Sequence, residues 1–168
     1  MLQINDNAVN PIIAMDFDGP CSLIFNDDGN QCYPKCGPIR KHLVNFIRFL
    51  KANNLDIVLN TCRENEGLDN AIQFLRENDI FDEFAAINEN IAPWDYDSRK
   101  IYAHMYVDDR AYGWEEYDDI LLDVAVQIMV KLLHAPTTIA FHIRNELAEG
   151  RIINVVEHMV ADDAVLVE

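Results

Sequence analysis

The sequence predicts an α/β fold, with a Rossmann-like parallel sheet and helices on both of its faces. Short apolar runs of strand length alternate along the chain with amphipathic stretches of helix length, an order typical of parallel sheets. The chain has 168 residues, of which 50% are hydrophobic, enough for one domain with a buried core. Acidic or polar residues directly follow several of the apolar runs, and ligands of parallel sheets bind where the strands end.

The first predicted strand, Ile12 to Met15, leads into two carboxylates and a glycine, Asp16, Asp18 and Gly19. Residues two apart in a strand point to the same face, so both carboxylates can converge on one cation or one phosphorus atom only where the strand ends and the backbone bends. Gly19 permits that bend at low cost. The segment therefore has the form of a catalytic strand end.

Residues 20–37 are expected to form a hairpin-like flap, because a turn signal, Asp27-Asp28-Gly29-Asn30, separates short apolar pieces. A helix is then expected to open at Gly37-Pro38, where proline suits the first turn, and to end at Asn53-Asn54. Its apolar positions share one helical stripe; they are Ile39, Leu43, Phe46, Ile47 and Leu50.

Three further strands are expected, at residues 57–59, 84–87 and 104–107. A second helix lies between the first two of them and has its own apolar stripe. The stripe consists of Leu68, Ala71, Ile72 and Leu75. Strands that alternate with helices in this way imply a parallel sheet with right-handed connections.

Polar residues that can bind a cation or a phosphoryl group follow three of the four predicted strands. They are Asp16 after the first strand, Thr61 after the second and Asp108 after the fourth. Because the carboxyl ends of parallel strands meet at one edge of a sheet, we expect these three residues to lie at the same edge.

The last third of the chain has a helical pattern throughout. Three candidate helices occupy residues 120–133, 139–147 and 152–159. Pro136 and Gly150 lie between them. We therefore divide the chain into an α/β core at residues 1–114 and a C-terminal helical extension at residues 115–168, which either packs on the core or forms a contact between copies in a homo-oligomer.

The formal charge of −16, from 13 basic and 29 acidic residues, argues against a nucleic-acid partner, because such affinity comes mainly from Lys and Arg displacing counterions. No apolar run has the length of a membrane span, and the first residues lack the features of a signal peptide. We therefore expect a cytoplasmic protein without membrane contact. The four cysteines form no paired C-x2-C knuckles, so we expect reduced thiols in preference to zinc ligands or disulfides.

Four motifs of the chain resemble those of the haloacid dehalogenase superfamily and occur in the family's order. They are Asp16-Phe17-Asp18-Gly19, Leu59-Asn60-Thr61, Lys100 and Val107-Asp108-Asp109. The resemblance covers the predicted core and is strongest for small bacterial and phage members that lack a cap domain. In those members, two further segments look familiar, Ser98-Arg99-Lys100 and Thr61-Cys62-Arg63-Glu64.

The resemblance implies phosphatase chemistry with a covalent intermediate. Asp16 would be the nucleophile, which attacks phosphorus to give an aspartyl-phosphate. Asp18 would protonate the leaving oxygen and then take a proton from the water that hydrolyses the intermediate. Thr61 and Lys100 would hold the phosphoryl oxygens.

The resemblance also implies a bound magnesium ion, a hard cation that prefers oxygen ligands. Asp16, the main-chain carbonyl of Asp18 and Asp108 would supply the protein ligands, and Asp109 would act through water. The cation would offset the repulsion among these acids and orient the substrate. The candidate substrate contacts are Gly19, Cys62 and Arg63.

Each assignment has a simpler alternative. Thr61 could cap the helix that follows it. Lys100 could be a surface lysine, in which case the neighbouring Arg99 is the other candidate for the cation that binds phosphate. Asp108-Asp109 could be a solvated turn. Pro20 departs from the family, in which Thr or Val usually occupies this position. Because proline removes a backbone N–H and fixes a torsion, weak or altered activity would follow.

We therefore predict a magnesium-dependent phosphatase that hydrolyses a small phosphorylated substrate. Nucleotides are among the candidates, because Trp94, Tyr96 and Tyr112 could stack on a nucleobase. The alternative is a binding or regulatory module with the same fold and little turnover, which Pro20 and the long helical tail suggest. Phosphoryl transfer to an acceptor other than water shares every residue with the first prediction.

Overall fold

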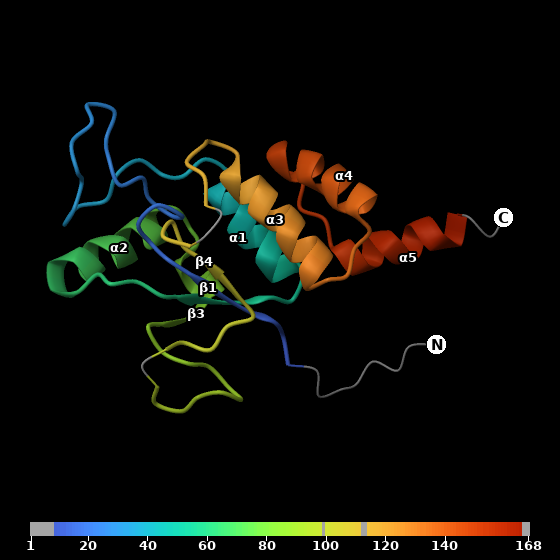
Figure 1. Ribbon diagram of the computed structural model, residues 1–168, viewed down its shortest axis with the longest axis horizontal. Helices are drawn as coiled ribbons and strands as arrows, with labels where there is room; N and C mark the ends of the chain where they lie inside the picture. The colour runs from blue at the N-terminus through green and yellow to red at the C-terminus, as the bar shows by residue number, and fades with distance from the viewer. Residues whose placement is uncertain (1–8, 99, 112–113, 166–168) are drawn as a thin grey trace.

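A computed structural model describes residues 9–98, 100–111 and 114–165 (Figure 1). Four strands form one parallel sheet in the order β3-β2-β1-β4. The strands are β1 (Ile12–Met15), β2 (Asp56–Leu59), β3 (Phe84–Ile87) and β4 (Met105–Val107). The helices are α1 (Leu43–Ala52), α2 (Asn65–Glu77), the short 3-10 helix η1 (Phe81–Glu83), α3 (Ile120–Lys131), α4 (Thr137–Ala148) and α5 (Val155–Val165). The predicted α/β class with a Rossmann-like parallel sheet is confirmed.

The carboxyl ends of the four strands are aligned. Met15 of β1 is paired in register with Leu59 of β2 and with Val107 of β4. The ladder continues one residue beyond the strands, because the Asp16 N–H donates to the Val107 carbonyl at 2.8 Å and the Asn60 N–H donates to the Met15 carbonyl at 2.9 Å. The residues that directly follow the strands are therefore held side by side along one edge of the sheet.

The two faces of the sheet are covered by different kinds of structure. Ile13 and Met15 point into a large buried cluster that contains residues of α1, α2, α3 and α4, whereas Ile12 and Ala14 point into a small cluster on the opposite face. This alternation is the period of two that a strand imposes. In Figure 1, α1, α3 and α4 form a layer on one side of the sheet.

The expected helices on the second face are replaced by a loop in the described residues. Right-handed connections place α1 and α2 on the same face as the chain steps from β1 to β2 to β3, and they send the return from β3 to β4 across the other face. That return is the segment 88–104, which contains no helix among its described residues. Its turn-forming composition includes Pro93, which disfavours a helix, and Ile91, Trp94 and Ile101 supply the apolar cover.

Helix α1 begins later than the sequence predicted. Residues around Pro38 pair with the start of the flap instead, since the Leu23 N–H donates to the Pro38 carbonyl at 2.8 Å and the Arg40 N–H donates to the Cys21 carbonyl at 3.0 Å. His42 then adopts a left-handed conformation, φ 66°, immediately before the helix. Tertiary pairing thus outweighs the local preference of proline for a first helical turn.

The C-terminal helices α3 and α4 share one buried cluster with α1. Their fully buried residues include Leu121, Ala125, Ile128 and Met129 of α3 and Ala140, Ile143 and Leu147 of α4. Helix α5 extends away from the body of the molecule towards the C-terminus (Figure 1). None of the helices in the described residues has the length and apolar character needed to cross a bilayer.

Candidate active site

Three aspartates converge at the carboxyl edge of the sheet. Asp16 follows β1, and Asp108 and Asp109 follow β4, so the pairing of these two strands brings them together. One carboxylate oxygen of each residue lies within 4.8 Å of the others, and all three residues are half-buried. Three of the four predicted metal-ligand residues therefore form one cluster.

The electrostatics of this cluster are unfavourable without a cation. The pKa of Asp16 is raised from its ordinary value of 3.8 to about 7, chiefly by burial and to a smaller extent by the nearby charges of Asp108, Asp18 and Asp109. A 2.7 Å hydrogen bond from the Phe17 N–H acts in the opposite direction. Burial also raises the pKa of Asp109, with Arg110 partly offsetting it. The cluster thus carries an excess of negative charge.

The donor set of the cluster fits a hard divalent cation. Carboxylate oxygens are the ligands that magnesium and calcium prefer, and a cation would relieve the repulsion that raises the Asp16 pKa. Asp108 is held in place by the Arg110 N–H, which donates to its Oδ1 at 2.8 Å. Asp16, Asp108 and Asp109 are therefore the residues that could hold such an ion.

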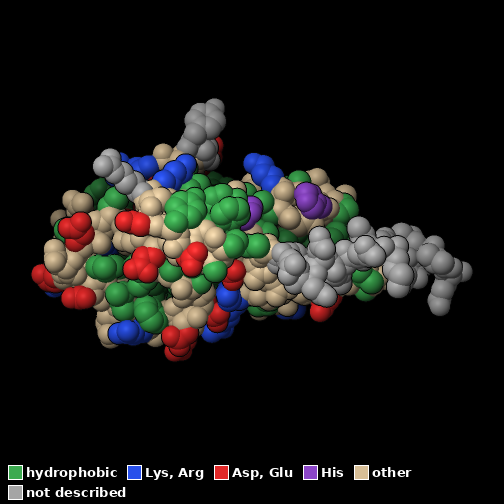
Figure 2. Space-filling model, turned by 90° about the horizontal axis from the view of Figure 1, so that it is seen from below, with side chains coloured by type: hydrophobic (Ala, Val, Ile, Leu, Met, Phe, Trp, Pro, Cys, Tyr) green, Lys and Arg blue, Asp and Glu red, His purple; other side chains and the backbone are tan. Residues whose placement is uncertain are grey.

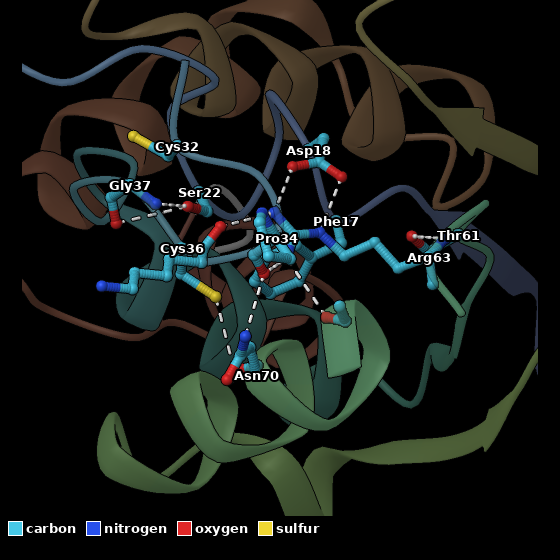
Figure 3. A network of polar contacts seen from close by, with 12 residues as sticks. Phe17, Asp18, Ser22, Cys32, Pro34, Cys36, Gly37, Thr61, Arg63 and Asn70 are labelled. Atoms are coloured by element: carbon cyan, nitrogen blue, oxygen red, sulfur yellow. Dashed lines mark hydrogen bonds and ion pairs between the residues drawn. The ribbon is translucent and has the colours of Figure 1, made fainter. Parts of the chain in front are cut away.

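The carboxylate of Asp18 lies outside this cluster and pairs with Arg63. The Arg63 Nε donates to Oδ2 of Asp18 at 2.8 Å, and Nη2 donates to Oδ1 at 2.7 Å (Figure 3). The arginine side chain is only 2% exposed, whereas that of Asp18 is 34% exposed. Although burial disfavours a charge here, the bonds to Asp18 raise the pKa of the Arg63 guanidinium.

The remaining donors of Arg63 bind main-chain carbonyls of the flap and of α2. Nη1 donates to the carbonyls of Pro34 and Gly67, at 2.8 and 3.1 Å, and Nη2 donates to that of Lys35 at 3.0 Å. All five N–H groups of the guanidinium are thus engaged. Arg63 was predicted to contact the substrate, but in this structure it has no donor left for one.

Thr61 lies beside this pair at the end of β2. Its hydroxyl accepts a hydrogen bond from the Arg63 N–H at 3.2 Å, and its own N–H donates to Oδ1 of Asn88 at 2.8 Å. Helix α2 begins at Asn65 and has no side-chain cap, so the alternative role of Thr61 as a helix cap is not found. The hydroxyl keeps its own hydrogen for donation to a ligand.

Gly19 allows the loop after β1 to approach the loop after β4. It adopts φ +91°, and a Cβ at this position would lie 2.6 Å from Cβ of Asp109. No L side chain fits this approach without a shift. Gly19 therefore shapes the acid cluster, while Cys62, the other predicted substrate contact in this region, is an exposed free cysteine.

Lys100 is exposed, and its Nζ lies 4.9 Å from the centroid of the Tyr106 ring on β4. No ion pair joins it to the aspartates within the described part of the chain, so its phosphate role stays a prediction. Arg99, its rival, lies outside the described residues. Of the candidate stacking residues, Trp94 packs on Tyr102 at 4.5 Å, and Tyr112 also lies outside the described residues.

One solved structure is similar to this chain. It comes from Bacteroides thetaiotaomicron and is described as a conserved protein; it is 28% identical, covers 77% of this chain and 95% of its own, and has a TM-score of 0.55. Its description gives no activity. No protein-family model matches the chain, and no curated protein matches it.

Two residues of the site were missed at the sequence level. Asn88 follows β3 just as Asp16 and Asp108 follow their strands, so the same positional signal could have found it. Arg40 is buried and donates through Nε to the Gly19 carbonyl at 2.8 Å. Only the unforeseen pairing of its segment with the flap places it there, and no local pattern marks it.

Proposed function

We propose that the protein is a magnesium-dependent phosphomonoester hydrolase of the haloacid dehalogenase type, acting on a small phosphorylated substrate. The observation that carries this proposal is the convergence of Asp16, Asp108 and Asp109 within 4.8 Å of one another at the carboxyl edge of a parallel sheet. Thr61 and the Asp18–Arg63 pair lie at the same edge. The similar solved structure supports the fold of this proposal and leaves its chemistry to experiment.

The proposed reaction has two displacements at phosphorus. In the first, a carboxylate oxygen of Asp16 attacks phosphorus, the bond to the leaving oxygen breaks, and protonated Asp18 gives its proton to that oxygen. In the second, water attacks phosphorus, Asp18 takes a proton from the water, and the bond from phosphorus to Asp16 breaks. Inorganic phosphate is released, and both aspartates return to their starting states.

The other groups orient and neutralise the phosphoryl oxygens. The Thr61 hydroxyl donates its free hydrogen, and Lys100 contributes positive charge. Arg63 acts on the substrate only through Asp18, which it holds in one orientation by two bonds. Magnesium held by Asp16, Asp108 and Asp109, with the Asp18 carbonyl, would supply the positive charge that these acids lack.

A specific observation favours a second candidate, a binding or regulatory module with little turnover. Both carboxylate oxygens of Asp18 accept bonds from a guanidinium whose donors are all engaged, so neither oxygen is without a protein partner as it would be in an acid poised for a leaving group. Pro20 adds to this reason, because it removes an N–H directly after the catalytic loop. Cytoplasmic location and contact between copies through the C-terminal helices stay predictions.

The proposal is tested by phosphate release from a panel of phosphomonoesters with and without magnesium. Wild type is compared with Asp16→Asn, which removes the nucleophile, and with Asp27→Asn, which changes an exposed acid at the tip of the flap. Magnesium-dependent turnover by wild type and Asp27→Asn, lost in Asp16→Asn, supports the hydrolase. A folded wild type that binds magnesium and releases no phosphate from any ester supports the regulatory module.

A further inference from the structure

A second buried arginine, Arg40, binds the residue that follows Asp18. Its side chain is only 3% exposed, and its Nε donates to the carbonyl of Gly19 at 2.8 Å. Arg63 binds the carboxylate of Asp18, one position earlier in the chain. The two arginines therefore act on consecutive residues of the loop after β1, Arg63 on a side chain and Arg40 on the main chain.

Both peptide groups of Gly19 are bound, and this fixes the direction of the Asp18 carbonyl. The Gly19 N–H donates to the Ser22 carbonyl at 2.8 Å, and Arg40 holds the Gly19 carbonyl. In a trans peptide, the N–H and the carbonyl of the preceding residue point in opposite directions, so the Asp18 carbonyl points away from Ser22. Within the described part of the chain, no group donates a hydrogen bond to this carbonyl. Its lone pairs stay available to the cation of the proposed reaction, on which this inference rests.

Gly19 also contacts the three-acid cluster. A Cβ on Gly19 would lie 2.6 Å from Cβ of Asp109, so Asp109 rests directly on the main chain of Gly19. A shift of the Gly19 backbone would therefore move Asp109 as well as the Asp18 carbonyl. By holding Gly19, Arg40 acts on two groups of the proposed cation site.

Arg40 also binds the segment that follows β4. Its Nη2 donates to Oε1 of Glu116 at 2.5 Å, and Nε1 of Trp114 donates to Oε2 of the same carboxylate at 3.1 Å. The Arg40 Cζ lies 5.8 Å from the centroid of the Trp114 ring. One guanidinium thus joins the loop after β1 to the chain that continues from Asp108 and Asp109.

Stability alone explains this arrangement poorly. Glu116 is 63% exposed, and an ion pair with a solvated partner contributes little net free energy, while burial of the arginine charge costs free energy. We propose that Arg40 is a positioning residue, which holds the Gly19 peptide so that the Asp18 carbonyl and Asp109 face one divalent cation. Its effect on the cation is indirect, through Gly19.

The test measures the affinity for magnesium by calorimetry, which needs no turnover. Arg40→Lys replaces two nitrogens, which bind Gly19 and Glu116, by one ammonium that can keep only one of these contacts. We expect the Kd for magnesium to rise about 10-fold or more, as when a group that orients a metal ligand is removed. Arg144→Lys is the matched control, because Arg144 of α4 forms a comparable ion pair with Asp123 of α3, at 2.6 Å, outside the loops of the site. Its Kd should equal that of wild type.

Manganese in place of magnesium shows whether a ligand has been lost, because both cations prefer oxygen ligands. If the Asp18 carbonyl leaves the cation in Arg40→Lys, water replaces it. The number of waters bound to Mn²⁺, read from the relaxation enhancement of water protons, then rises by about one. A variant that is merely less stable keeps the wild-type Kd and the wild-type number of waters.

Glu116→Gln is the second variant, at an exposed position, and serves where Arg40→Lys does not fold. It weakens the bond to the segment after β4 and leaves the bond from Arg40 to Gly19 in place. The Kd for magnesium should rise by about 2- to 5-fold, the size of one partly solvated ion pair. An unchanged Kd in this variant overturns the proposal.

The failure of this inference and the failure of the hydrolase give different results. A raised Kd and an added water in Arg40→Lys support the positioning role even in a protein that hydrolyses no ester, an outcome that overturns the hydrolase alone. Equal Kd and equal numbers of waters in wild type and Arg40→Lys, with magnesium-dependent turnover in both, overturn the role of Arg40 and leave the hydrolase intact. A wild type that binds neither cation overturns the cation site and this inference with it.

Discussion

Arg63 binds both carboxylate oxygens of Asp18 and, with its remaining donors, three main-chain carbonyls of the flap and α2. One buried guanidinium therefore fixes the orientation of the proposed acid and the position of the flap together. A planar fork with five donors is needed for this arrangement, and lysine cannot reproduce it. Acid and flap are thus coupled through a single side chain.

Arg63→Lys should lower kcat more than it raises KM. Asp18 would lose its bidentate partner while Asp16, the proposed nucleophile, stays in place, so we expect a fall in kcat of about 10- to 100-fold. Lost buried hydrogen bonds should also reduce the free energy of unfolding by about 2–4 kcal/mol. Steady-state kinetics and denaturant unfolding measure both effects. Arg48→Lys, at an exposed position of α1, is the control. Equal kcat and equal free energy of unfolding in the two variants would contradict the coupling of Asp18 and the flap through Arg63.

The stability of the metal-free protein should fall as pH rises through the range set by Asp16. The pKa of this carboxyl is about 7 in the folded protein and 3.8 ordinarily, so between these values the folded state binds more protons than the unfolded state. The free energy of unfolding then decreases with rising pH, by about 1–3 kcal/mol from this group. Asp16→Asn should flatten this slope between pH 5 and 8 in chelator. An unchanged slope would show that Asp16 is ionised normally.

Magnesium should raise the melting temperature more at pH 8 than at pH 5.5. Protons compete with the cation for Asp16 at the lower pH, because burial and the neighbouring acids raise its pKa. The effect should disappear in Asp108→Asn, which removes one charge from the three-acid cluster. Sodium chloride at matched ionic strength is the control. A shift of the same size from either salt would indicate general screening and no site.

Sequence patterns predicted most of the sheet but not the loop that packs on its second face. β1 and β3 lie at the predicted residues, because short apolar runs with polar flanks leave little choice of boundary. The start of α1 was misplaced by five residues, from Pro38 to Leu43, since the pairing of its upstream residues with the flap is a tertiary contact. The packing of the loop 88–104 on the second face of the sheet could not be predicted either, because irregular segments show no periodic pattern of apolar residues.

The candidate site was predictable to the extent that it follows from strand ends. Asp16 and Asp108 meet because their strands pair in parallel, which the order of motifs implied. The partners of Arg63 were not predictable, because Asp18, Pro34 and Gly67 come from three separate segments. Side chains whose contacts are distant in the chain carry no local signal of their role.

Gly19→Ala should destabilise the protein more than Gly29→Ala does. Both glycines have positive φ, +91° and +77°, so both variants lose the conformational freedom of glycine, at a cost of about 1–2 kcal/mol. Only at Gly19 would the new methyl group meet Cβ of Asp109, at 2.6 Å, whereas nothing lies within 4 Å of the same group at Gly29. The difference in free energy of unfolding between the two variants therefore isolates the close approach of the loop after β1 to the loop after β4. We expect this difference in unfolding free energy to exceed about 1 kcal/mol. Magnesium should also bind more weakly to Gly19→Ala alone, because Asp109 must move away from the cluster. Equal unfolding free energies with unchanged magnesium affinity would show that the two loops do not depend on this contact.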